Sequence, residues 1–199
     1  MTYPKSINNL ISNLKNLPGV GEKTAERMAL AMIDFDKEKL GSFSDSITDV
    51  KDKIRHCLIC NNLSEEDECI ICKDKTRDSG ILCIVDDVRS LMLFEKNNLF
   101  NGKYHILKGL ISPSNGIDPE DIDIEALINR VEKEKIKELI IAVKPSLEGE
   151  ATALYIAKRL EPKNITVSKI AHGVPMGADM EYLDAITLRT ALFERKKIS

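Results

Sequence analysis

Two closely spaced cysteine pairs are the residues of this chain best suited to chemistry. Cys57 and Cys60 form one CxxC pair and Cys69 and Cys72 form a second, so four of the five cysteines lie within residues 57–72. Each CxxC turn can place two thiolates on one ion, and four thiolates complete the tetrahedral shell that Zn²⁺ prefers. Because four thiolates leave no open coordination position, the sequence predicts one structural zinc ion per chain. Disulfide pairing is the alternative, but no other feature of the chain is typical of a secreted protein.

A second candidate site is the glycine-containing segment LPGVG at residues 17–21. Gly19 and Gly21 allow the backbone to approach a phosphate closely, and the free N–H groups at a helix start point toward an anion. Lys23 and Arg27 lie four residues apart, so both project from one face of the following helix. A site that binds phosphates predicts DNA binding without sequence specificity. An ordinary corner between two helices, with two solvated cations, is the alternative interpretation.

Helical periodicity surrounds this segment. Residues 6–16 have the apolar spacing of an amphipathic helix, with Ser6 as its expected N-cap, and residues 23–33 resume the same spacing. A third helix, with an apolar seam over residues 40–54, needs a partner surface. The first 56 residues are too few to bury a good core alone. Pairing of two chains and packing against the zinc segment of the same chain are both open explanations for the seam.

The pattern changes to alternating strands and helices after residue 80. Apolar runs with the length of buried strands span residues 81–85, 104–107, 139–143 and 166–170. Helical patterns follow the first strand to about residue 96 and span residues 124–135, 148–160 and 184–195. In the third of these helices we expect Ala151, Leu154 and Ala157 to face inward. This alternation predicts a mainly parallel sheet covered on both faces.

Ligand sites in such sheets lie at the carboxyl ends of the strands. Here those ends are residues 86–87, 144–150 and 172–177. Glu148 and Glu150 begin a helix, where carboxylates either stabilise the positive end of the helix dipole or contact a partner. His172 is interpreted equally well as loop packing or as a contact to a phosphate or partner. Cys83, inside a strand, is expected to be a packed core thiol.

Composition limits the possible classes of protein. The sequence contains no apolar run near twenty residues, and its N-terminus lacks the apolar core of a signal peptide. We therefore expect a cytoplasmic protein with no membrane span, in which thiols stay reduced. The net charge is −3, so any contact with nucleic acid must come from a local basic patch.

Together these motifs resemble the RecR family of bacterial recombination proteins. The resemblance covers nearly the whole chain and depends on residues 17–21, the two CxxC pairs, GLISP at 109–113, EGEAT at 148–152 and AHGVP at 171–175, with Glu181 and Tyr182 following. It implies a helix-hairpin-helix region at residues 1–56, a four-cysteine zinc finger at 57–72, a Toprim-like α/β domain at 80–175 and a C-terminal helical segment at 176–199.

The resemblance also implies a function and partners. It implies a DNA-binding mediator that acts with RecO and RecF in recombinational repair, as a homo-oligomer that is a dimer or a tetrameric ring able to encircle DNA. It places the RecO contact on the Toprim-like domain, for which Glu148 is the candidate residue. It implies DNA contacts by Gly19, Gly21, Lys23 and Arg27.

One departure bears on catalysis. Toprim enzymes hold Mg²⁺ with a glutamate after the first strand and an Asp-x-Asp after a later one. The corresponding positions here are Asp86, Lys144 and Ser146. An ammonium cannot ligate Mg²⁺ and a hydroxyl is a poor substitute for a carboxylate, so the sequence predicts no enzyme activity. Two alternatives are a Toprim-type metal-dependent nuclease or topoisomerase, and a zinc-dependent interaction module with no DNA role.

Overall fold

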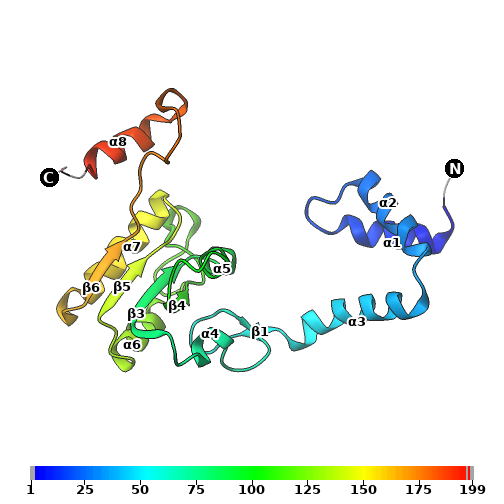
Figure 1. Ribbon diagram of the computed structural model, residues 1–199, viewed down its shortest axis with the longest axis horizontal. Helices are drawn as coiled ribbons and strands as arrows, with labels where there is room; N and C mark the ends of the chain where they lie inside the picture. Colours follow the sequence, from blue (N-terminus) through cyan, green and yellow to red (C-terminus); the bar gives the residue numbers. More distant parts are fainter. Residues whose placement is uncertain (1–2, 196, 198–199) are drawn as a thin grey trace. The chain divides into compact units, whose positions relative to one another are not determined.

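The computed structural model describes residues 3–195 and residue 197, and it separates into two compact units at Ile54 and Arg55. The first unit contains the helices α1 (Lys5–Lys15), α2 (Glu22–Ile33) and α3 (Lys37–Lys53) (Figure 1). The predicted N-cap at Ser6 is wrong. Pro4 is the N-cap, because its carbonyl accepts hydrogen bonds from the backbone N–H groups of Ile7 at 3.0 Å and Asn8 at 3.1 Å.

The core of the first unit is small. Among its described residues only Ile11, Ala25 and Ala29 are buried, and partly buried apolar side chains of α1 and Val20 pack against them. Helix α3 contains no buried residue, and its predicted seam includes Ile47 at 61% and Val50 at 64% exposure. The seam therefore forms on a helix but has no cover within its own unit.

The second unit begins with the cysteine segment and continues into a four-stranded sheet. The cysteine segment contains the antiparallel strands β1 (Arg55–His56) and β2 (Leu63–Ser64) and the short helix α4 (Ile70–Lys73). The sheet consists of β3 (Asp78–Val85), β4 (Gly102–Ile106), β5 (Glu138–Ile141) and β6 (Thr166–Lys169) in the order β4-β3-β5-β6. All three pairings are parallel, as the alternating pattern predicted.

Helices cover both faces of this sheet. Leu82 and Ile84 of β3 pack in a cluster with apolar residues of α6 (Ile124–Lys133) and α7 (Leu147–Leu160). Cys83 and Val85 point to the opposite face, where they share a cluster with Leu91 of α5 (Val88–Lys96) and three of the paired cysteines. The 3₁₀ turns Pro113–Asn115, Glu161–Lys163 and Met180–Tyr182 and the helix α8 (Ala185–Phe193) complete the unit.

Helix α7 differs from the prediction in its rotation. Ala151 and Leu154, predicted to face inward, are exposed, whereas Thr152 and Ala153 are buried. Two contacts set this rotation. The Thr152 hydroxyl accepts a hydrogen bond from the Ile111 N–H at 2.9 Å, and a Cβ at Gly149 would lie 2.1 Å from the Lys144 carbonyl oxygen. The small glycine must therefore face the preceding loop, and this contact rotates Leu154 toward solvent.

Candidate zinc centre and nucleic-acid interface

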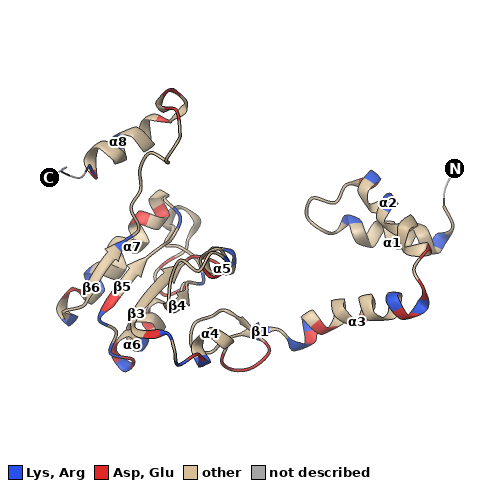
Figure 2. Cartoon of the chain, viewed as in Figure 1, with Lys and Arg blue, Asp and Glu red and all other residues tan. Residues whose placement is uncertain are grey.

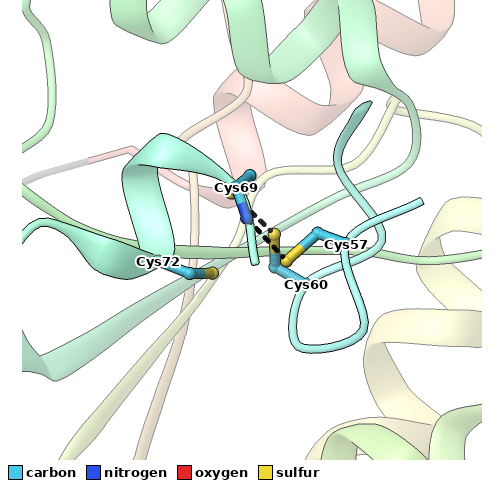
Figure 3. A group of neighbouring side chains, drawn as sticks. All are labelled: Cys57, Cys60, Cys69 and Cys72. Atoms are coloured by element: carbon cyan, nitrogen blue, oxygen red, sulfur yellow. Dashed lines mark hydrogen bonds between the residues drawn. The ribbon is translucent and has the colours of Figure 1, made fainter. Parts of the chain in front are cut away.

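The four paired cysteines converge on one point. Their Sγ atoms all lie within 4.8 Å of one another, and Cys60 and Cys69 are 3.5 Å apart at sulfur (Figure 3). A tetrahedral zinc with Zn–S bonds of about 2.3 Å requires sulfurs roughly 3.8 Å apart, so the cluster fits this ion closely. Cys57, Cys60, Cys69 and Cys72 thus form one four-cysteine zinc finger site per chain, with no ligand position left open for catalysis.

Local backbone geometry places these thiols. The first turn is closed by hydrogen bonds from the Cys57 N–H to the Asn62 carbonyl at 2.7 Å and from the Asn61 N–H to the Cys57 carbonyl at 3.0 Å. Asn61 takes the left-handed conformation that this turn requires, with φ of 61°. In the second turn Cys69 is the N-cap of α4, its N–H donates to the Cys57 sulfur at 3.3 Å, and Cys72 lies within the helix (Figure 3).

Cys69 differs from the fifth cysteine, Cys83, in the direction of its pKa shift. Hydrogen bonding from the Cys60 thiol and then from Cys72 lowers the pKa of Cys69, and hydrogen bonding to Cys69 raises the pKa of Cys60. One thiolate is thereby favoured even before metal binding, which requires deprotonated ligands. Cys83 lies outside the cluster, and burial raises its pKa to about 12, as expected of a core thiol.

His56, the neighbour of Cys57, does not join the zinc ligands. Its Nδ1 lies 2.9 Å from the Asn61 carbonyl oxygen, and the group of possible metal ligands among the described residues contains only the four cysteines. His105, on β4, is 3% exposed. Burial and the nearby charge of Arg130 lower the pKa of His105 to about 4.

The hairpin between α1 and α2 presents its two glycines differently. Gly19 has φ of +81°, which favours glycine, and the Val20 N–H donates to the Leu17 carbonyl at 3.1 Å. Gly21 is the N-cap of α2 with φ of −85°, a conformation open to any residue, and a Cβ there would meet no atom within 4 Å. No side chain among the described residues caps this helix start.

The cations beside the hairpin are available for contacts. Lys23 and Arg27 are exposed on α2, and within the described part of the chain neither has an ion-pair partner. The acidic residues of the same helix are already engaged, since Glu22 pairs with Lys15 and Glu26 accepts a hydrogen bond from Tyr3. Figure 2 marks the lysine and arginine positions of α2 in blue.

The carboxyl ends of β3 and β5 enclose a cavity of about 390 Å³, which Asp86, Asp87, Lys144 and Glu148 line together with the loop after β4. The Asp86 carboxylate accepts hydrogen bonds from the Ser90 hydroxyl at 3.1 Å and the Lys144 backbone N–H at 3.4 Å. Ser146 is the N-cap of α7 and accepts from the Gly149 N–H. At the two positions that the resemblance aligns with the Asp-x-Asp, Lys144 therefore donates a backbone hydrogen bond to Asp86, and Ser146 caps the start of α7.

The two glutamates of α7 point to different surroundings. Glu148 lines the cavity beside Asp86, and hydrogen bonding with Ser146 lowers its pKa. Glu150 instead pairs with Lys169 at 2.8 Å and lies 3.8 Å from Nδ1 of His172. His172 also donates its backbone N–H to Glu194 at 3.3 Å. His172 is thus packed against Glu150 and Glu194, but its buried Nε2 has no hydrogen-bond partner among the described residues, so its role stays a prediction. Glu148 is the glutamate that faces the carboxyl edge of the sheet.

Sequence reasoning missed two buried cations, Lys103 on β4 and Arg130 on α6, which are 8% and 7% exposed. Arg130 donates to the Tyr104 carbonyl at 2.6 Å and pairs with Glu134 at 2.9 Å. Lys103 precedes the apolar run predicted as a strand, so the sequence pattern placed it outside the strand.

Among the described residues, none of the helices combines the length and apolar composition that crossing a lipid bilayer requires.

Comparison with known proteins gives matches along the whole chain. Family models match residues 7–51 (RecR, helix-hairpin-helix), 54–74 (RecR, four-cysteine zinc finger domain), 80–171 (Toprim domain) and 173–196 (RecR, C-terminal). The recombination protein RecR of Natranaerobius thermophilus is 45% identical over 196 residues, which is 98% of each chain. Those of Staphylococcus saprophyticus and Staphylococcus haemolyticus are 43% and 42% identical over 198 residues, covering 100% of each chain.

Proposed function

Because this chain belongs to the RecR family of recombination proteins, we propose that it is a cytoplasmic DNA-binding mediator of recombinational repair. In this proposal it binds DNA without sequence specificity, assembles as a homo-oligomer and acts with RecO and RecF as a non-catalytic clamp or scaffold. The DNA-binding part rests on the start of α2, which no side chain among the described residues caps. Lys23 and Arg27 follow Gly21 there, are exposed, and have no ion-pair partner in the described part of the chain.

Gly21 gives this proposal its sharpest support. Neither its backbone angle nor the described residues around it require a glycine, so the feature that glycine preserves is open space in front of the helix start. A phosphate in that space accepts hydrogen bonds from the first N–H groups of α2 and gains from the positive end of the helix dipole. Gly19, by contrast, serves the turn itself through its positive φ.

The test separates DNA binding from folding. Serine is a better N-cap than glycine, so Gly21→Ser should keep or raise thermal stability while its side chain occupies the phosphate space and competes for the same N–H groups. We expect weaker DNA binding in fluorescence anisotropy, with Gly41→Ala on α3 as the matched control. DNA affinity equal to that of the unmodified chain would contradict this placement of the site.

Salt dependence tests the two cations. If Lys23 and Arg27 each bind one phosphate, Lys23→Ala and Arg27→Ala should each reduce the slope of log affinity against log salt concentration by roughly 0.7–0.9. The double variant should bind DNA with an affinity that is reduced by the same factor whatever the DNA sequence. An unchanged slope would move the contact elsewhere, and a marked base preference would contradict phosphate recognition.

We further propose that Glu148 contacts RecO. It is the glutamate of α7 whose surroundings include no ion pair among the described residues, and it lines the cavity at the carboxyl edge of the sheet. Glu148→Lys should weaken RecO binding in a pull-down or titration while thermal unfolding stays unchanged. Glu150→Gln serves as the comparison, because Glu150 is engaged with Lys169. Normal RecO binding by Glu148→Lys would remove this residue from the contact.

A further inference from the structure

We propose that Lys103 is a positioning residue for the zinc centre. Its buried ammonium group holds the second CxxC turn against β4, the edge strand of the sheet, and so determines how tightly the chain retains zinc. The proposal concerns the sheet side of the zinc finger, and it does not depend on the DNA-binding or partner contacts proposed above.

The hydrogen bonds of Lys103 are complete. Its Nζ donates to the backbone carbonyls of Asp74 at 2.7 Å, Cys72 at 2.8 Å and Ile71 at 2.9 Å. An ammonium group has three donors, and all three are used here. Burial of a charged group is costly unless hydrogen bonds replace its water, so this arrangement persists only while the three carbonyls stay in place.

These carbonyls belong to the end of the helix that carries a zinc ligand. Helix α4 spans only Ile70–Lys73, with Cys69 as its N-cap and Cys72 inside it (Figure 3). Carbonyls at a helix end lack partners within the helix, and a lysine ammonium satisfies them and complements the negative end of the helix dipole. By fixing the carbonyls of Ile71 and Cys72, Lys103 fixes the direction from which the Cys72 thiolate reaches the metal.

The two CxxC turns are attached to β4 by different means. The first is held by backbone and amide hydrogen bonds, from the Ile106 N–H to the Cys60 carbonyl and from the Asn61 side-chain amide to the Ile106 carbonyl, both at 2.9 Å. In the second turn the hydrogen bonds to β4 come from the Lys103 side chain. One substitution can therefore release the second turn while leaving the first in place.

Charge strengthens the coupling between Lys103 and zinc. Zinc with four thiolates carries a net negative charge, so a buried ammonium bonded to the Cys72 carbonyl is more favourable with the metal bound than without it. Since such coupling is reciprocal, removal of the ammonium should weaken zinc binding. Groups that orient metal ligands from behind typically contribute 10- to 100-fold to metal affinity.

The experiment compares Lys103→Met with Lys73→Met in the full chain. Lys73 follows Cys72 directly, but its side chain is exposed and pairs with Glu66, so its replacement removes an equal charge near the zinc without breaking the hydrogen bonds to the carbonyls. Zinc release to a chromophoric chelator should be about 10- to 100-fold faster in Lys103→Met. In Lys73→Met it should stay close to the rate of the unmodified chain.

Two further measurements keep the proposal testable if Lys103→Met folds poorly. The Co²⁺-substituted protein reports tetrahedral geometry through its visible absorption, and we expect an altered spectrum in Lys103→Met and in Lys103→Arg, whose planar group cannot match three converging carbonyls. Urea unfolding with and without zinc should show a smaller stabilisation by zinc in Lys103→Met. Unchanged zinc release, or a stability loss that is the same with and without zinc, would overturn the proposal.

Discussion

The two units of this chain complete their folds by different means. The helical unit buries Ile11, Ala25 and Ala29 and leaves the apolar side of α3 exposed. The second unit buries both faces of a parallel sheet and includes three zinc ligands, Cys57, Cys60 and Cys69, in one of its two cores. A small segment without a metal or a large core depends on association for its stability. The comparison therefore indicates that the helical unit must bury the apolar side of α3 against a surface outside itself, whereas zinc completes the second unit.

The units also differ in how they use their cations. In the second unit Lys103 and Arg130 are buried against backbone carbonyls, and Arg77 pairs with Glu95 at 2.5 Å. In the helical unit Lys23 and Arg27 are exposed and, among the described residues, unpaired. A cation that is already engaged in hydrogen bonds or an ion pair within the fold is poorly available to a ligand. Exposed cations such as Lys75 and Lys137 also occur in the second unit, so it is the position of Lys23 and Arg27 beside the start of α2, rather than exposure alone, that favours them as phosphate contacts.

The largest expected effect comes from removing zinc. Cys57→Ser should lose both the metal and the fold of the second unit, because structural zinc contributes about 10–16 kcal/mol in zinc-finger peptides and domain stabilities are about 5–15 kcal/mol. Metal analysis and circular dichroism check this, and the helical unit should keep its helical signal. A soluble, folded Cys57→Ser protein without zinc would remove the basis of the comparison.

A smaller effect is expected on self-association, which we place on α3. Ile47→Glu together with Val50→Glu should lower the oligomeric state in sedimentation velocity, because two charges would enter an otherwise apolar contact. Ser44→Glu, an exposed polar position on the same helix, is the control. If the assembly keeps its size in the double variant, the contact between copies lies outside this part of α3.

The histidine-linked pH dependence of stability should report the second unit alone, because all three histidines lie in it. The folded pKa of His105, about 4, is below its usual value of 6.5. The unfolded chain therefore binds more protons between these values, and stability falls as pH decreases through this range. Relative to pH 7, stability at pH 5 should drop by about 2 kcal/mol more in the unmodified chain than in His105→Gln. Urea unfolding checks this, and equal losses in both proteins would contradict a buried neutral His105.

The smallest expected effect is on catalysis. We predict neither cleavage nor relaxation of supercoiled or single-stranded DNA in Mg²⁺ or Mn²⁺, because Lys144 and Ser146 stand where a second and third carboxylate would be needed. Asp86→Ala should then behave as the unmodified chain in gel assays. Cleavage that disappears in Asp86→Ala would give the second unit an enzymatic role.

The zinc centre and the fold class follow from the sequence because their signals are local. The spacing within each CxxC pair determines two ligands over four residues, and the change from helical to alternating periodicity after residue 80 indicates a parallel sheet. The hairpin glycines and the two cations beside them are also visible as a short motif. In each case the residues that carry the signal are close neighbours in the chain.

Other features required the tertiary structure because they depend on residues far apart in sequence. The rotation of α7 is set by the contact of Gly149 with the Lys144 loop and of Thr152 with Ile111, so periodicity within the helix misplaced Ala151 and Leu154. Lys103 lies 29 to 32 residues from the carbonyls that it binds, and no local pattern links it to the second CxxC turn. The sequence alone thus determined which residues bind zinc, whereas only the packing of α4 on the edge strand brought Lys103 to the carbonyls of the second CxxC turn.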